Sequence, residues 1–77
     1  MTFAELKEFE TIDDELEKAE NLVLEIDEKI AQAGSDYVLL QKLTEEKEAA
    51  EAEYERITER WVYLTDLDEK IKSAKNN

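Results

Sequence analysis

Carboxylates are the most abundant side chains in this sequence that could do chemistry. The chain has 22 Asp and Glu among its 77 residues, and some of them are adjacent, as in residues 13–15 and 45–46. General acid–base catalysis requires two carboxylates that converge on a pocket able to shift their pKa values. Acidic residues that follow one another along a helix usually form a solvated face instead. We therefore expect no catalytic residues in this domain and no enzymatic activity from it.

Side chains that bind metals or cofactors are scarce. The sequence has no His, no Cys and a single Gly. Zinc sites are built mainly from Cys and His, calcium loops follow an Asp-rich pattern that includes a Gly, and nucleotide phosphates need a Gly-rich cradle. None of these patterns occurs in the sequence. We therefore expect no metal site and no cofactor-binding residue in the domain.

A second chemistry is indicated by residues 54–67, YERITERWVYLTDL, which hold the only Trp, Trp61, and two of the three Tyr. Within this stretch Arg56 and Arg60 are one helical turn apart, a spacing suited to phosphate groups. Glutamates flank both arginines, however, and ion pairs within the helix are the simpler interpretation of the same residues. The candidate residues for contact with a nucleic acid or a protein partner are Arg56, Arg60, Tyr63, Lys70, Lys72 and Lys75.

The formal net charge of −12 disfavours a nucleic acid as the partner. Residues 1–33 carry eleven acidic and three basic side chains, a net charge of −8, and residues 34–77 carry eleven and seven, a net charge of −4. A field of this sign repels phosphate backbones. The absence of Cys is typical of a reducing compartment, and no apolar run approaches the ~18 residues of a membrane span. We therefore expect a cytoplasmic protein that does not bind a membrane.

The elements that must position these residues are helices. Thr2 stands three residues before Glu5, a capping-box spacing that predicts a helix start near Phe3. The apolar residues that follow alternate in steps of three and four, which is the heptad seam of a helix packed against another helix. This first helix is expected over about residues 3–33. Its seam runs through Phe9, Ile12, Leu16, Ala19, Val23, Ile26, Ile30 and Ala33.

Residues 34–36 are the only place where the chain is expected to turn. Gly34 can adopt the left-handed conformation that closes a helix, and Ser35 or Asp36 can then accept the N–H groups that open the next one. A second helix is expected over about residues 37–74. Its seam runs through Leu40, Leu43, Lys47, Ala50, Tyr54, Ile57, Trp61, Leu64, Asp68 and Ile71.

A turn this short makes the two helices antiparallel and adjacent. The predicted fold is therefore all-α, a single domain over residues 1–77 with two long helices in an antiparallel coiled-coil hairpin. Facing residues have numbers that add up to about 70, so Ala19 meets Ala50 and Trp61 meets Phe9. At the open end we expect Phe3, Leu6, Leu64, Leu67 and Ile71 to close around that aromatic pair.

Two further expectations concern a charged residue within the second seam and apolar residues outside both seams. Lys47 faces Val23, and we expect its stem to pack there while its ammonium group reaches a glutamate such as Glu20. Apolar residues off the seams leave open a pairing of two hairpins, although single exposed apolar residues are common and we expect a monomer. The residues that would form the pairing surface are Leu22, Leu24, Val38, Val62 and Tyr63.

Residues 34–67 resemble the C-terminal domain of ABC-F proteins of the Uup type, which are tandem ATPases of the ABC superfamily without a membrane-spanning part. The resemblance rests on the turn Gly34-Ser35-Asp36-Tyr37 and on the Arg60-Trp61 pair. Leu40 and Leu43 after the turn, Leu64 after the Trp, and the upstream segment TFAELKEFETID also match the family pattern, so the resemblance covers essentially the whole chain.

The resemblance implies a two-helix coiled coil that follows the second ATPase domain of a longer parent protein, with Met1 as a start added to an excised domain. ATP and magnesium would be bound by the parent and not by this domain. The implied function is a non-catalytic interaction and regulatory domain of a cytoplasmic ABC-F ATP-binding protein that acts in translation. Its partner would be the ribosome or the parent's own ATPase domains.

Two other functions stay open at this point. In some relatives the terminal coiled coil has been linked to DNA binding, so the domain could be a nucleic-acid-binding arm of the same ATPase. The strongly acidic sequence departs from the basic face that such relatives are expected to present. The domain could also be a plain coiled-coil dimerisation module.

Overall fold

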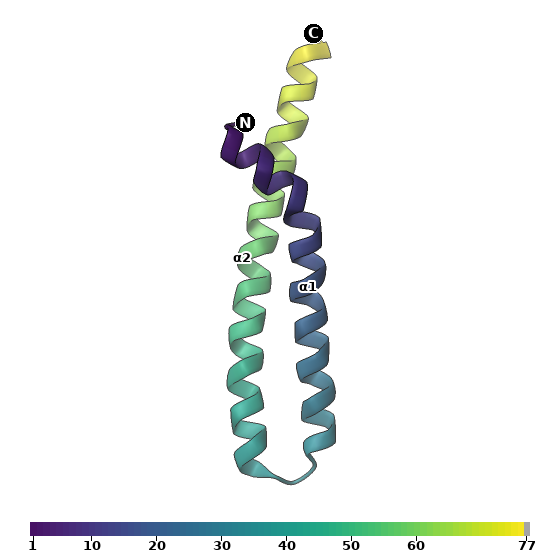
Figure 1. Ribbon diagram of the computed structural model, residues 1–77, viewed down its shortest axis with the longest axis vertical. Helices are drawn as coiled ribbons and strands as arrows, with labels where there is room; N and C mark the ends of the chain where they lie inside the picture. The colour runs from purple at the N-terminus through teal and green to yellow at the C-terminus, as the bar shows by residue number, and fades with distance from the viewer. Residues whose placement is uncertain (77) are drawn as a thin grey trace.

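The chain forms an antiparallel hairpin of two helices (Figure 1). The computed structural model describes residues 1–76, and the side chains of residues 1–74. Helix α1 spans Phe3–Ala33 and helix α2 spans Tyr37–Asn76, two residues beyond the expected end. The hairpin is long and thin, with extents of 61 × 17 × 14 Å. The predicted all-α hairpin is thus confirmed, and neither helix in the described part of the chain is long and apolar enough to cross a bilayer.

Helix α1 begins with the predicted capping box. The backbone N–H of Glu5 donates to Thr2 Oγ1 at 3.2 Å, and the backbone N–H of Thr2 donates to Glu5 Oε1 at 2.9 Å. These two bonds satisfy N–H groups that have no partner within the helix. The start of α1 is therefore set by two residues three positions apart.

The turn between the helices is a β-turn that starts at Ala33, and not the expected left-handed helix cap. Gly34 has φ 64° and ψ −122°, and the Asp36 N–H donates to the Ala33 carbonyl at 3.3 Å. This combination matches the first central position of a type II′ turn, which Gly occupies because φ is positive there. Asp36 then caps α2, since its Oδ1 accepts from the Leu39 N–H at 3.1 Å. The positive φ of Gly34 is confirmed, but its ψ differs from the expected left-handed value.

The core is a single row of aliphatic side chains along the hairpin. In each helix, one of the two heptad positions of the predicted seam is buried, except at the end residues Ala33 and Ile71, and the other position is only half-buried. Two helices alone can cover one stripe per helix, and no third layer lies over the second position. The buried residues are Ile12, Ala19 and Ile26 of α1 and Leu43, Ala50, Ile57 and Leu64 of α2.

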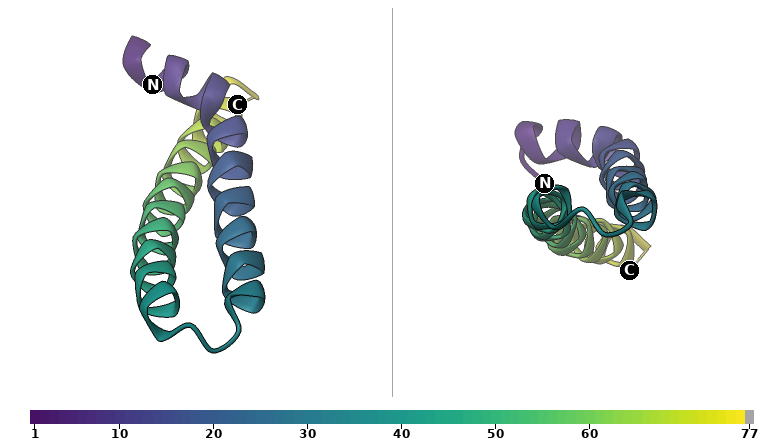
Figure 2. Two further views of the ribbon diagram at one scale, coloured as in Figure 1. Left: turned by 60° about the horizontal axis from the view of Figure 1, so that its bottom comes forward. Right: turned by 90° about the horizontal axis from the view of Figure 1, so that it is seen from below.

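The first turns of α1 leave the axis of the rest of the helix and cross α2 near the open end (Figures 1 and 2). In the N-terminal part of α1 the Thr11 hydroxyl donates to the carbonyls of Lys7 and Glu8 at 3.5 and 3.3 Å. Because of the bend, Phe3 and Leu6 do not lie in the expected core. Their side chains are 75% and 49% exposed. Their predicted role in closing the open end is therefore wrong, whereas Leu64 is fully buried.

Candidate interaction surface

The segment of α1 that crosses α2 is attached there through Arg60. Arg60 Nε donates to Glu8 Oε2 at 2.7 Å, and its guanidinium lies 4.7 Å from the centre of the Tyr63 ring. Tyr63 Oη in turn donates to Glu5 Oε2 at 2.9 Å, which raises the pKa of the phenol. Two residues expected to be free for a partner thus hold the two helices together.

Trp61 belongs to the same end of the hairpin. Its ring is half-buried against the core, and its Nε1–H donates to Asp13 Oδ1 at 2.9 Å. The indole therefore packs on one side and bonds to a carboxylate on the other, as amphipathic aromatic side chains commonly do. Tyr54, one heptad earlier, also packs half-buried against the core.

The remaining basic candidates are spread along α2. Arg56 forms an ion pair with Glu53, which is the largest cause of the lowered pKa of that carboxyl, and Lys72 Nζ lies 3.0 Å from Asp68 Oδ2. Lys70 is exposed. The side chain of Lys75 lies outside the described residues. Arg56, Arg60 and Lys72 each lie against carboxylates of this chain, so acidic side chains offset the charge of these three candidates.

Lys47 occupies its seam position with a different partner from the expected one. Its Nζ lies 2.6 Å from Asp27 Oδ1 and 3.7 Å from Glu51 Oε1, and the bond to Asp27 is the main cause of the raised pKa of the ammonium group. The expected ion pair across the hairpin is present, but the choice of Glu20 is wrong. Asp27 lies nearer to the turn, so the side chain of Lys47 extends toward the tip of the hairpin.

Residues of the turn motif stand at the tip. Gly34, Ser35 and Asp36 are exposed, and the side chain of Tyr37 is 83% exposed. The hydrogen bonds of this segment account for Gly34 and Asp36 as structural residues. Tyr37 has no such role in the core, because it begins α2 on the outside of the hairpin.

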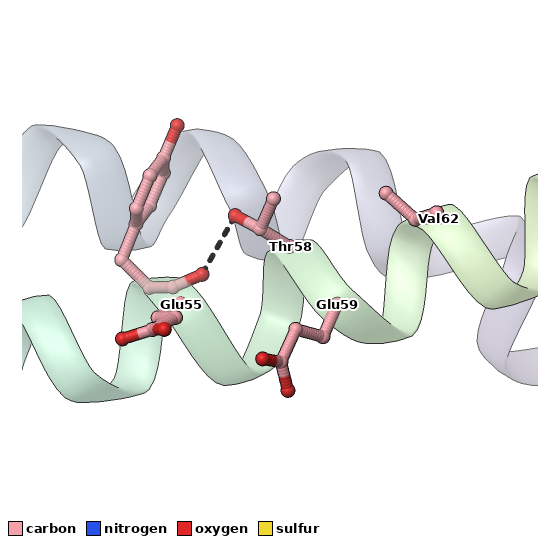
Figure 3. Close-up of a pocket in the computed structure, with 5 residues that line it drawn as sticks. Glu55, Thr58, Glu59 and Val62 are labelled. Atoms are coloured by element: carbon pink, nitrogen blue, oxygen red, sulfur yellow. Dashed lines mark hydrogen bonds between the residues drawn. The ribbon is translucent and has the colours of Figure 1, made fainter.

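A groove runs along one flank of the hairpin, and we call it the Tyr54 groove. It consists of two adjoining hollows of about 430 and 280 Å³ that share Tyr54. Figure 3 shows its α2 part, where Thr58 Oγ1 donates to the Tyr54 carbonyl at 2.8 Å and Glu55 and Glu59 leave the helix on the same side. The lining residues are Glu20, Val23 and Leu24 of α1 and Glu51, Tyr54, Glu55, Thr58, Glu59 and Val62 of α2.

The opposite flank carries a second groove, the Leu22 groove, with a different composition. Its two hollows share Leu22 and Glu53, and its lining includes both acidic and basic side chains. The charged residues that line it are Glu15, Lys18, Lys29, Glu46, Glu53 and Arg56. The two flanks of the hairpin therefore differ in charge, although both have apolar floors.

Several residues of these surfaces were not singled out from the sequence as functional. Glu5, Glu8 and Asp13 accept hydrogen bonds from α2, and only the capping role of Glu5 was predictable from spacing. The groove glutamates look like ordinary helix-surface acids when the sequence is considered alone. Leu24 and Val62 stood out as apolar residues off the seams, and that signal locates part of the Tyr54 groove.

Comparison with known proteins identifies one family. The family model of the ABC transporter C-terminal domain matches residues 1–66, which include α1, the turn and most of α2. Searches of curated proteins and of solved structures returned no significant match.

Proposed function

Since the chain belongs to the family of ABC transporter C-terminal domains, we propose that it is a non-catalytic interaction and regulatory domain of a tandem ATPase of the ABC-F, Uup-like type. Membership of the family makes it an accessory domain of an ABC protein. In the proposed function, the ATPase domains of the parent bind ATP and magnesium, and this hairpin acts as an arm. The arm contacts the ribosome in the cytoplasm and couples that contact to the nucleotide state of the parent.

The shape of the molecule is the observation that carries this proposal. A rod 61 Å long and only 17 × 14 Å across exposes side chains and encloses little space. Its hollows are open grooves between or along the helices, and in the described part of the chain the fully buried side chains are all apolar. Such an element is suited to binding a partner at a distance from the body that carries it, and not to surrounding a substrate.

Charge supports a protein surface of the ribosome over nucleic acid as the contact. The net charge of −12 attracts basic proteins and repels phosphates, and ribosomal proteins are largely basic. The arginines that would have to bind a phosphate backbone are already bonded to Glu53 and Glu8. A nucleic acid would have to displace these carboxylates.

The proposal is tested on the parent ATPase with and without the hairpin. Ribosome co-sedimentation is measured with ATP, with ADP and with a non-hydrolysable ATP analogue, and ATP turnover is measured with and without ribosomes. We expect deletion to change the nucleotide dependence of association or the ribosome-stimulated turnover. If both the ribosome association and the ATP turnover of the parent are unaltered by the deletion, the proposed function is refuted.

The DNA-binding alternative has a separate test. It requires binding that falls steeply with added salt and that is lost in the double variant Arg56→Glu and Arg60→Glu. We expect a flat titration of DNA against the chain even at low salt. Saturable, salt-sensitive binding that the double variant abolishes would favour the alternative instead.

A further inference from the structure

On one side of the hairpin, residues of the two apolar seams remain partly exposed outside the contact between the helices. Apart from Ala33, the half-buried seam residues of α1 are seven residues apart, so they share one face of the helix, and apart from Ile71 the same holds for α2. Val23 and Tyr54 are members of these two sets, and both line the Tyr54 groove. The half-buried sets are Phe9, Leu16, Val23 and Ile30 in α1 and Leu40, Lys47, Tyr54, Trp61 and Asp68 in α2.

Exposed apolar residues widen this stripe. Leu24 is 54% exposed and Val62 is 47% exposed, and each lines the groove beside a half-buried neighbour. The larger hollow is lined by the ring of Tyr54 and the side chain of Val62 together with Glu55, Thr58 and Glu59. Along α2 the groove extends from Glu51 to Val62, about 17 Å at 1.5 Å per residue, which is the length of a helix of about three turns.

The charged residues that line this apolar floor are all acidic. Glu20, Glu51, Glu55 and Glu59 line the groove, and no Lys or Arg is among its lining residues in the described chain. Within the described residues, only Glu51 of these four has a cation within 4.0 Å, namely Lys47 at 3.7 Å. The Leu22 groove differs, because three basic side chains line it together with three acidic ones.

We propose that the Tyr54 groove is the docking site for a basic amphipathic α-helix of a separate protein. The apolar face of that helix covers Val23, Leu24, Tyr54 and Val62, and its lysines or arginines pair with the groove glutamates. This is the helix-in-groove mode of recognition, in which one apolar face supplies contact area and flanking charges set orientation. The inference deepens the proposed function, on which it rests for the idea that the arm meets a protein, by naming the surface and the class of partner.

Charge also decides against two other occupants of the same groove. A second copy of the chain carries the same net charge of −12, so two acidic flanks would face each other. A nucleic acid would place phosphates against four glutamates. A cationic helix is the occupant that both the apolar floor and the acidic rim favour.

The test uses the 77-residue chain and a synthetic 18-residue helix with leucines on one face and lysines on the other, without aromatic residues. Calorimetry measures binding, and fluorescence of Trp61, in the same half-buried set as Tyr54, reports occupation of the flank. Two control peptides carry Glu in place of Lys, or the same residues in an order with no amphipathic face. We expect binding of the first peptide, weakened by added salt, and none of either control.

Matched variants separate groove binding from general attraction to an acidic protein. Leu24→Ser alters the Tyr54 groove and Leu22→Ser alters the opposite one, and the two leucines are similarly exposed at 54% and 47%. The double variant Glu55→Gln and Glu59→Gln is compared with Glu45→Gln and Glu48→Gln, which removes the same charge from exposed positions of α2. We expect about three- to tenfold weaker binding for each groove variant and less than about twofold for each control.

Equal weakening by the groove and control variants would overturn the proposal, as would binding of the Glu peptide. Self-association of the chain at physiological salt that Leu24→Ser abolishes would overturn it in favour of a second copy. The proposed function fails independently, because a parent whose ribosome association and ATP turnover are both unaltered by deletion of the hairpin refutes that function even if the peptide binds in the groove. Conversely, a deletion effect on the ribosome with no groove-specific peptide binding refutes this inference alone.

Discussion

Single polar contacts at the open end decide how the first turns of α1 are placed. Arg60, Trp61 and Tyr63 are consecutive or nearly so in α2, and each bonds to a different carboxylate of α1. These groups are partly exposed, and individual ion pairs of this kind stabilise a fold only weakly. Their effect is mainly on geometry, since together they determine where the bent segment crosses α2.

Glu5 makes the attachment of this segment dependent on pH. The Thr2 backbone N–H and the Tyr63 hydroxyl donate to its carboxylate, and both lower its pKa. A carboxyl whose pKa is lowered by folding stabilises the folded state above its unfolded pKa of about 4.3. That contribution is lost as the pH falls through the lower, folded value.

We therefore predict that hydrogen exchange of the amides in the first turns of α1 accelerates in acid relative to the mid-hairpin, after correction for intrinsic rates. Glu5→Gln should show the fast exchange already at neutral pH and lose most of the acid dependence. Glu10→Gln, which changes an exposed acid of the same helix, serves as the control and should behave as the unmodified chain. An acid response that Glu5→Gln leaves intact would show that another group is responsible.

At the scale of the elements, the turn between the helices depends on one backbone conformation. A Cβ on Gly34 would meet no heavy atom within 4 Å, so steric contact with the rest of the hairpin is not the constraint. The constraint is the combination of φ 64° and ψ −122°, a region in which residues with a Cβ are strained.

We predict that Gly34→Ala lowers the free energy of unfolding by about 1–3 kcal/mol. Gly34→Asn should cost a similar amount, because Asn tolerates the left-handed helical region and the ψ of −122° lies outside that region. Ser35→Ala is the neighbouring control and should change stability by less than about 0.5 kcal/mol. Chemical denaturation measures all three, and a fully tolerated Asn would indicate that the left-handed cap forms in solution.

The pairing of the helices depends on a small number of fully buried residues. Leu64 has no exposed surface, and its side chain lies in the cluster that includes Ile12 and Ile57. We predict that Leu64→Ala lowers the free energy of unfolding by about 2–5 kcal/mol. In a domain with so thin a core this loss is a large part of the total stability.

Val38→Ala is the matched comparison for Leu64, because Val38 also lies in α2 but is 81% exposed. Its substitution should change the free energy of unfolding by less than about 0.5 kcal/mol. Thermal unfolding followed by circular dichroism distinguishes the two variants. Equal effects of both substitutions would mean that the helices are not paired through the row that contains Leu64.

At the scale of the whole molecule, charge and shape act together. The net charge of −12 is spread over a rod 61 Å long, so like charges of two copies meet wherever their flanks approach. We predict a monomer at physiological salt over a wide range of concentration, with the frictional behaviour of an elongated particle. Sedimentation velocity and equilibrium check both properties.

Salt provides the control for this prediction. Since screening lengths fall to about 3 Å at 1 M salt, any tendency of the apolar flank to self-associate should appear there first. Leu24→Ser should suppress such association and Leu22→Ser should not, because only the former lies in the Tyr54 groove. A stable dimer at physiological salt would support the dimerisation module and contradict the monomer.

Local patterns in the sequence predicted most of the fold. The Thr2 and Glu5 capping box, the single Gly and the two heptad seams are short-range features, and each determines its element through contacts with residues three, four or seven positions away. They predicted the helices and the position of the turn correctly, and the buried row is one of the two heptad positions of the predicted seams. The fold class follows because a short turn leaves two long helices no arrangement other than side by side.

The tertiary structure alone decided which contacts the long polar side chains beside the core make, namely those of Arg60, Tyr63 and Lys47. The bend of α1 places its first turns across α2 (Figure 1), so Arg60 and Tyr63 meet glutamates more than fifty residues away, while Phe3 and Leu6 are exposed. Lys47 likewise bonds to Asp27 instead of Glu20, because the positions of the two helices determine which carboxylate lies nearest. Several carboxylates lie within reach of each long side chain at similar energies, and the axis of the helix decides among them. The sequence by itself therefore determined the two helices and their buried row. The acidic Tyr54 groove depends on residues of both helices, so it could be located only from their positions in the tertiary structure.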